Sequence, residues 1–230
     1  MELFRVMFRV DYPPAFSIFN RWGDALALLN GNKLWTNLGE TPNVRQIVAQ
    51  HIDQEKGQNH NTVVAIGNIS GNIEEYPIKA LEPFERVFRD VTDLVKLLDV
   101  TSFLRIGARF IFMEEAESFA VAETGFAKQI SSDYLSVVKG ELTDLSLITV
   151  HKDGDHFRRI NAGPITKKEF AAWFSTPTKV EIENAALVDV DFYTLEYKFK
   201  TFDLRKFFDL AFDDARKQAV GIMKLAKGGG

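Results

Sequence analysis

Four arginines occupy matching places in two segments where apolar and polar residues alternate, and their side chains are the strongest candidates for chemistry in this chain. They are Arg5 and Arg9 of LFRVMFRVD, and Arg105 and Arg109 of FLRIGARFI. A guanidinium group binds phosphate or carboxylate through two parallel N–H donors. Four such groups on one surface would form an anion site, so we consider them candidates for binding an anion or a partner.

Two aspartates offer these arginines an internal partner instead. Asp189 and Asp191 alternate with valine and phenylalanine, which indicates the polar face of another strand. Opposite charges on neighbouring strands stabilise a sheet by about 0.2–1 kcal/mol per pair. We expect Arg105 and Arg109 to face these aspartates in a structural charge ladder. An anion site and a catalytic role are the alternatives, and no residue is predicted to be catalytic.

A second basic cluster lies in the segment HFRRINAGPITKK, which begins at His156. It holds Arg158, Arg159, Lys167 and Lys168 near an aromatic residue, a combination that fits nucleic acid. The whole chain is acidic, with a formal net charge of −4 and a pI near 5.7. This balance disfavours nucleic acid outside a local patch. Arg158 and Arg159 remain candidate binding residues for an anion or a partner.

The densest group of possible metal ligands is the run HKDGDH, from His151 to His156. Histidine and carboxylate side chains bind zinc and related divalent ions. Asp153-Gly154, however, is typical of the centre of a tight hairpin, whose flanking side chains need not converge. We therefore predict no metal and no cofactor. The chain also has no cysteine, which excludes disulfides, thiolate metal sites and a cysteine nucleophile.

Strands must position the arginines, because apolar residues alternate with them at a period of two. One face of each segment is predicted to hold Phe4, Val6, Phe8 and Val10, or Leu104, Ile106, Ala108 and Phe110. The second half of the chain repeats the order of elements of the first, close to β-α-β-β-α-β. The sequence thus predicts an α+β fold. Pseudo-duplicated split βαβ, or ferredoxin-like, units would form a largely antiparallel sheet covered by helices.

The predicted domain organisation is one compact unit over residues 1–227, followed by a tail at 228–230. Two pseudo-repeats would cover about 1–113 and 103–227, and no linker rich in Pro, Gly and Ser divides them. The strand at 103–113 would end the first repeat and begin the second. The first role places it at a sheet edge and the second in the centre, so its position stays open.

Local patterns also predict individual elements. Helices are expected at Pro13–Asn30, Leu81–Leu98, Ser118–Val138 and Lys167–Phe174, and after Asp203. Strands are expected at Thr62–Ile69, Ile73–Ile78, Leu142–Val150 and His156–Ala162, and within Lys179–Phe199. Hairpin turns are expected at Gly71-Asn72 and Asp153-Gly154.

The polar stretch at 30–61 is predicted to be the least regular part of the chain. A short helix would carry Val44, Ile47, Val48 and Ile52. Trp35 lies in this stretch without a long element to bury it. Either the stretch folds back onto the body, or Trp35 anchors a partner, since aromatic residues dominate interface energetics.

Three motifs resemble a sporadically distributed bacterial family of uncharacterised α+β proteins. They are the R-I-G-x-R strand with Arg105, Gly107 and Arg109, the L-V-D-V-D strand with Asp189 and Asp191, and the Phe-rich final helix. The motifs are short, but the resemblance covers most of the chain. The chain departs from the family at 110–112, where a Tyr and an Asn are expected. The resemblance implies a bacterial, mobile-element or defence context. It does not indicate a particular activity.

These observations favour a binding protein over an enzyme. No apolar run approaches the roughly 18 residues of a membrane helix, and the lack of cysteine fits a reducing cytosol. We expect a non-catalytic cytosolic interaction or ligand-binding protein that works with a protein partner or as a homodimer. The alternative is an RNA-binding protein or ribonuclease built on paired ferredoxin-like units.

Overall fold

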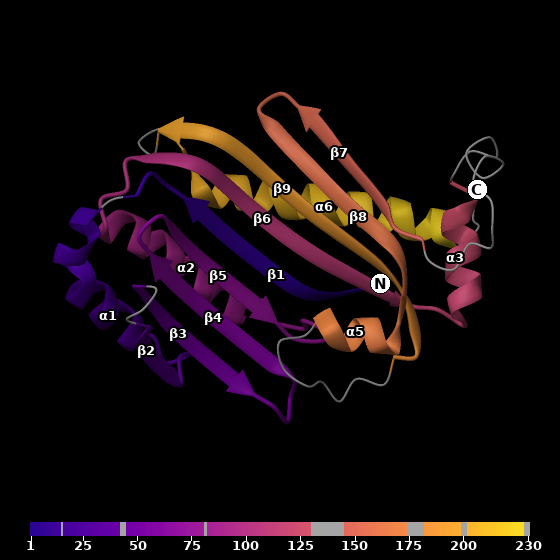
Figure 1. Ribbon diagram of the computed structural model, residues 1–230, viewed down its shortest axis with the longest axis horizontal. Coiled ribbons are helices and arrows are strands. Elements are labelled where there is room, and N and C mark those ends of the chain that lie inside the picture. Colours follow the sequence, from indigo (N-terminus) through magenta and orange to yellow (C-terminus); the bar gives the residue numbers. More distant parts are fainter. Residues whose placement is uncertain are drawn as a thin grey trace.

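A computed structural model describes residues 1–14, 16–41, 45–80, 82–129, 145–173, 182–198 and 202–227. The strands are β1 (Glu2–Asp11), β2 (Asn37–Thr41), β3 (Gln46–Asp53), β4 (Gln58–Ala65), β5 (Asn68–Glu74), β6 (Ser102–Glu115), β7 (Leu147–Asp153), β8 (His156–Thr166) and β9 (Asn184–Lys198). They form one antiparallel sheet in the order β2-β3-β4-β5-β1-β6-β9-β8-β7 (Figure 1). The protein is therefore a mixed α/β structure built on a nine-stranded sheet.

The helices lie mainly on one face of this sheet. They are α1 (Trp22–Asn30), α2 (Glu82–Leu97), α3 (Phe119–Ala127), α5 (Lys167–Trp173) and α6 (Leu204–Ala226), with a 3-10 helix at Phe16–Arg21 before α1. In Figure 1, α2 and α6 run behind the sheet and α5 lies in front of it. The buried residues of α2 recur at helical spacing, as the sequence predicts, because an amphipathic helix turns one apolar stripe toward the sheet. The opposite face stays largely uncovered by described helices, and we call it the open face.

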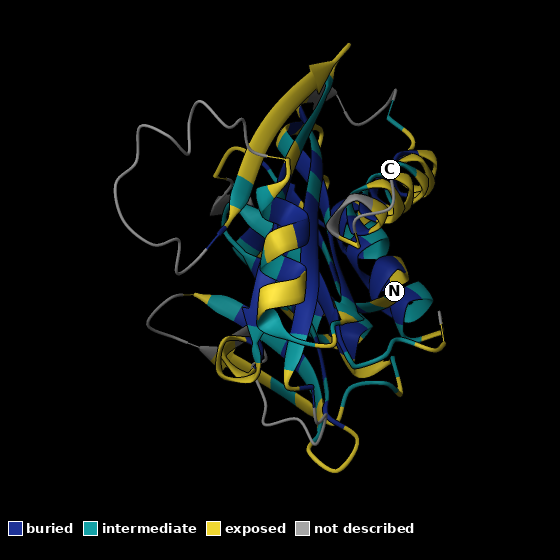
Figure 2. Ribbon diagram, turned by 90° about the vertical axis from the view of Figure 1, so that its right-hand side faces the viewer, coloured by how far each residue is buried: buried dark blue, intermediate teal, exposed yellow. Residues whose placement is uncertain are grey.

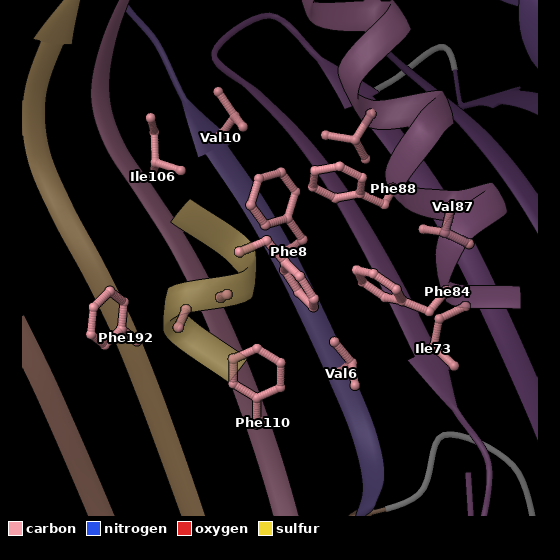
Figure 3. Close-up of a cluster of buried hydrophobic side chains, with 14 of the residues drawn as sticks. Val6, Phe8, Val10, Ile73, Phe84, Val87, Phe88, Ile106, Phe110 and Phe192 are labelled. Carbon is pink, nitrogen blue, oxygen red and sulfur yellow. The ribbon is translucent and has the colours of Figure 1, made fainter. Parts of the chain in front are cut away.

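Aromatic side chains hold the helical layer to the central strands. Phe208 of α6 lies 5.4 Å from Phe110 of β6, 5.5 Å from Phe88 of α2 and 6.2 Å from Phe8 of β1, measured between ring centroids. Figure 3 shows the labelled members of this cluster converging between sheet and helices. Such ring pairs add about 0.5–1.5 kcal/mol each beyond the area they bury. One core therefore joins elements from both halves of the chain.

The predicted alternation is right for most of the two arginine strands and wrong at one residue in each. Phe4 lies on the open face, where it contacts Phe170 of α5 with ring centroids 6.0 Å apart. The pairing of β1 with β6 shifts register between Leu3 and Arg5, and this irregularity turns Phe4 over. Leu104 is 49% exposed, and Phe103 takes the buried place instead.

The ferredoxin-like duplication is not confirmed. In a ferredoxin-like unit a single strand separates the two strands that a crossover helix joins. Here three strands, β3, β4 and β5, lie between β1 and β2, and two strands, β8 and β9, lie between β6 and β7. The strand predicted at 103–113 is central, because β6 pairs with β1 on one side and β9 on the other. Each half instead runs as a first strand, a helix, a meander back to that strand, and a long helix, α2 or α6.

Two local predictions in the first half are wrong. The stretch at 30–61 contains β2, β3 and the start of β4 rather than a short helix. The hairpin expected to turn at Gly71-Asn72 turns instead at Ile66-Gly67, and both former residues lie inside β5. Gly71 was a misleading signal because its role is packing: a Cβ atom there would lie 2.4 Å from Val87 Cγ1.

Several helix and turn predictions are confirmed. Thr166 and Glu169 form a capping box, in which the Thr166 N–H donates to Glu169 Oε2 at 2.8 Å. Asp203 caps α6 by accepting a bond from the Lys206 N–H at 3.0 Å. The hairpin between β7 and β8 turns at Gly154, whose φ is +57°.

Residue 15 of the helix predicted at 13–30, residue 44 of the short helix and residue 81 of the helix at 81–98 lie outside the described residues, as do parts of four further predicted elements. They are the end of the helix at 118–138, the first residues of the strand at 142–150, residue 174 at the end of the short helix, and parts of the segment at 179–199. The tail at 228–230 also lies outside them. Among the described helices, no segment is both long and apolar enough to cross a membrane.

Candidate anion-binding hollow on the open face

The four candidate arginines come together on the open face because of strand parity and register. Alternate residues of β1 and β6 are buried against the helices, namely Val6, Phe8, Val10, Ile106, Ala108 and Phe110. The four arginines occupy the positions of opposite parity, so their side chains point to the open face. The two strands are antiparallel neighbours in which Arg9 lies opposite Gly107 and Met7 opposite Arg109. The four arginines therefore share one surface of adjacent strands.

The arginines surround a hollow of about 320 Å³ over the middle of the sheet. Its lining includes all four arginines together with Met7, Asn61, Ser70, Asn72, Gly107 and Asp191. A volume of this size lies at the lower end of the range for small-molecule sites. We call this feature the arginine hollow.

Arg105 is held flat against the sheet by three contacts. Its Nη2 donates to both carboxylate oxygens of Asp191, at 2.9 and 2.7 Å. Its guanidinium carbon lies 4.6 Å from the centre of the Tyr193 ring, a cation–π contact. A Cβ atom on Gly107 would come within 3.3 Å of the same guanidinium group, so the glycine leaves room for it.

Arg109 forms a two-bond ion pair with a nearly buried aspartate. Its Nε and Nη2 donate to the two oxygens of Asp189 at 2.7 and 2.6 Å, in a parallel two-bond arrangement. The Asp189 side chain is only 7% exposed. This hydrogen bonding raises the pKa of Arg109 above its usual value. Both arginines therefore contact the aspartates that the sequence predicts, and the expected charge ladder is present.

Of the remaining two arginines, Arg5 contacts the neighbouring strand β5, and Arg9 contacts a residue of its own strand. Arg5 donates from Nε to Asn72 Oδ1 at 2.8 Å and lies 3.6 Å from Glu74, which is fully buried. Arg9 donates from Nε to Asp11 at 2.7 Å and keeps 53% of its side chain exposed. Each guanidinium group is thus oriented by a residue of the protein before any ligand arrives.

The charges of the hollow are arranged unevenly. Its described lining has four guanidinium groups and one carboxylate, that of Asp191. The carboxylates of Asp11, Glu74 and Asp189 approach the arginines from outside this lining. Burial raises the pKa of Asp191, although Arg105 and Arg109 both act to lower it. The four guanidinium groups therefore line the space, whereas three of the four carboxylates that balance their charge lie outside its lining.

The basic cluster at 156–168 does not form one surface. Arg158 turns toward α6, where its Nε donates to Asp214 at 2.7 Å, and its Nη2 donates to Asp153 at 3.2 Å. Arg159 lies on the open face, where its register partner is Asp191. Lys167 pairs with Glu183 at 2.5 Å. The contiguous basic patch suggested by the sequence is therefore divided between both faces and the end of α5.

Trp35 folds back onto the body of the protein. Its Nε1 donates to Asp90 Oδ2 at 2.7 Å, and Asn32 Nδ2 donates to the same oxygen at 2.8 Å. The ring also packs against the main core. Burial raises the pKa of Asp90, and these two bonds offset part of that effect. Of the two interpretations of this stretch, the structure agrees with the one in which it folds back.

The two histidines of the HKDGDH run have different surroundings. His151 is exposed, with Nε2 3.0 Å from Thr149 Oγ1. His156 packs its ring against Phe192 and Phe207, at centroid distances of 5.1 and 6.1 Å. Within the described ranges, no group of three or more His, Cys, Asp or Glu residues could hold a metal ion. The expectation that this hairpin binds no metal stays a prediction.

Sequence reasoning missed the amide part of the hollow. Asn61 and Asn72 line it and face each other in the register of β4 and β5. Asn72 was hidden by the misplaced hairpin turn, and Asn61 by the polar stretch at 30–61, which was expected to be irregular. The alternation of Ile69, Gly71 and Ile73 with Ser70 and Asn72 was the signal for a strand with a polar outer face.

No family model, curated protein or solved structure matches this chain. The resemblance of the arginine and aspartate strands to a bacterial family therefore stays a prediction. The geometry of the arginine hollow is the basis for a function.

Proposed function

We propose that this protein is a non-catalytic binding protein whose arginine hollow takes up a small molecule with a phosphate or carboxylate group. The observation that supports it most directly is the convergence of four oriented guanidinium groups on one space of about 320 Å³. Orientation by Asp11, Glu74, Asp189 and Asp191 reduces the side-chain entropy that binding would otherwise cost.

The chemistry of the lining, apart from the carboxylate of Asp191, fits binding rather than catalysis. Arginine stays protonated in proteins, and asparagine and methionine side chains neither take up nor release protons near neutral pH. The arginine and asparagine side chains donate hydrogen bonds to a bound anion without transferring a proton to it. A small ligand also fits the size of the hollow better than a polymer does.

The test is calorimetry at constant ionic strength, with inorganic pyrophosphate as the phosphate probe and citrate as the carboxylate probe. Arg9→Gln is the main variant, because the Arg9 side chain is half exposed and its replacement should disturb the fold little. Arg105→Lys keeps the charge and loses the planar fork. Each change removes charge-assisted hydrogen bonds and should weaken binding about tenfold.

Arg205→Gln is the matched control. Arg205 lies on α6, where it pairs with Glu85 and Asp209, and its replacement should leave probe binding unchanged. Failure of both probes to bind, or equal binding by the Arg9 variant, would overturn the proposal. Tight binding of single-stranded RNA with a steep salt dependence, and no effect of either free probe, would support the nucleic-acid alternative instead.

A further inference from the structure

The two edges of the sheet differ in length and in character. The edge strand β2 has five residues, NLGET, most of them polar. The other edge strand, β7, has seven, and Figure 2 shows it as an exposed strand that projects beyond the rest of the molecule. In the part of the chain that the structure describes, no strand lies beside the outer edge of β7. Alternate N–H and C=O groups of β7 therefore point away from β8, where a further strand would pair.

Two β-branched side chains stand on the open-face side of this edge. Ile148 is 56% exposed and Val150 is 60% exposed, the highest values among the large hydrophobic residues described. Their register partners on β8 are the polar residues Asn161 and Arg159. Surface aliphatic residues on an unpaired strand edge mark a place where strands add.

We propose that a second copy of this chain covers β7, through antiparallel β7–β7 pairing about a two-fold axis at Thr149. In this register Ile148 of one copy lies opposite Val150 of the other, and the same contact is made twice, as a symmetric interface requires. Four β-branched side chains then form one apolar cluster across the axis. The sheet continues through both copies, and the two open faces lie on the same side.

The charged end of β7 favours the register with its axis at Thr149 over the register with its axis at Val150. With the axis at Thr149, Lys152 lies opposite Ser146 and Asp153 opposite Leu145, so both charges stay at the ends of the paired stretch. An axis at Val150 would place Ile148 opposite Lys152 and separate the aliphatic residues. Because the contact involves little more than one strand from each copy, the dimer depends on protein concentration.

The experiment uses the absence of cysteine from the chain. Thr149→Cys places one thiol on the proposed axis, where the two Cα atoms would be about 4.5–5.5 Å apart, within disulfide range. Mild oxidation should convert most of this variant into a covalent dimer. Gly39→Cys is the matched control on β2, where a new Cβ atom meets nothing within 4 Å, and it should give no more than trace dimer.

Light scattering after size exclusion provides the second measurement. The molar mass of the unmodified chain should rise from that of the monomer to that of the dimer as its concentration increases. The double variant Ile148→Lys, Val150→Lys should stay monomeric. A chain that stays monomeric at every concentration overturns the proposal. Equal cross-linking of the Thr149 and Gly39 variants overturns it as well. Neither measurement involves the arginine hollow, so failure here leaves the proposed anion binding untouched.

Discussion

The burial of His60 in β4 predicts that the stability of this fold depends on pH. His60 is 1% exposed, and its Nδ1 has no hydrogen-bond partner. Burial, assisted by His51 at a ring distance of 5.8 Å, lowers the pKa of His60 to about 4. An unfolded histidine has a pKa of about 6.5. Between about pH 6.5 and 4, His60 binds a proton in the unfolded chain but not in the folded chain, so a lower pH favours unfolding.

We therefore predict that His60 makes the free energy of unfolding fall as the pH drops from 6.5 toward 4, and that above pH 6.5 it adds no pH dependence. The 2.5-unit difference corresponds to roughly 3 kcal/mol at the acid end. Urea unfolding at several pH values measures the slope, and His60→Gln should flatten it. His151→Gln is the control, because that side chain is exposed. An unchanged slope in the His60 variant would assign the acid sensitivity to another group.

The ion pairs show how far residue-level prediction reaches. The contacts of Arg105 and Arg109 with Asp191 and Asp189 follow from sequence alternation, because side chains of neighbouring strands meet only when they share a face. Which arginine meets which aspartate does not follow from it. The direct register partner of Arg109 is Asp191, yet Arg109 binds Asp189 and leaves Asp191 to Arg105. The diagonal choice depends on sheet twist and side-chain reach.

At the scale of elements, Gly71 sets the distance between α2 and β5. A Cβ atom there would lie 2.4 Å from Val87 Cγ1 and 3.3 Å from Val91 Cγ2. Gly71→Ala should therefore push the helix from the sheet and cost about 2 kcal/mol of unfolding free energy. Urea denaturation at pH 7 measures this, with Gly39→Ala as a control whose new atom meets nothing within 4 Å.

A double variant separates crowding from any intrinsic effect of alanine. Val87→Ala removes the atom that the new methyl group would strike, so Gly71→Ala with Val87→Ala should cost clearly less than the sum of the two single changes. Contacting residues commonly show coupling of about 0.5–3 kcal/mol. Additive costs would mean that Val87 is not the obstacle.

Element boundaries were hardest to predict where strands carry polar residues on both faces. In β4, Asn59, His60 and Thr62 are buried although they are polar, so the sequence around GQNHN looks like a loop. Nothing local indicates that this stretch pairs with β3 and β5. The helices were easier, because α2 carries its own apolar period and α6 its own cap.

At the scale of the whole molecule, β1 and β6 join the two halves into one sheet, and Phe208 contacts aromatic rings from both. We therefore predict a single cooperative unfolding transition in urea. In a Trp173→Phe variant, fluorescence reports only on Trp22 and Trp35 in the first half, whereas far-UV circular dichroism reports on all helices. The two midpoints should coincide. Separated midpoints would show that the halves unfold independently.

The sequence by itself determined the properties that depend on local spacing. Period-two alternation established the arginine strands and their polar face, helical spacing established α2, and capping residues established the starts of α5 and α6. Only the tertiary structure decided the strand order, the turn of β4 into β5, the inversion of Phe4 and the gathering of asparagines around the arginines. These features depend on pairing between residues far apart in the chain, whose register is set by the packing of the whole sheet and not by neighbouring residues.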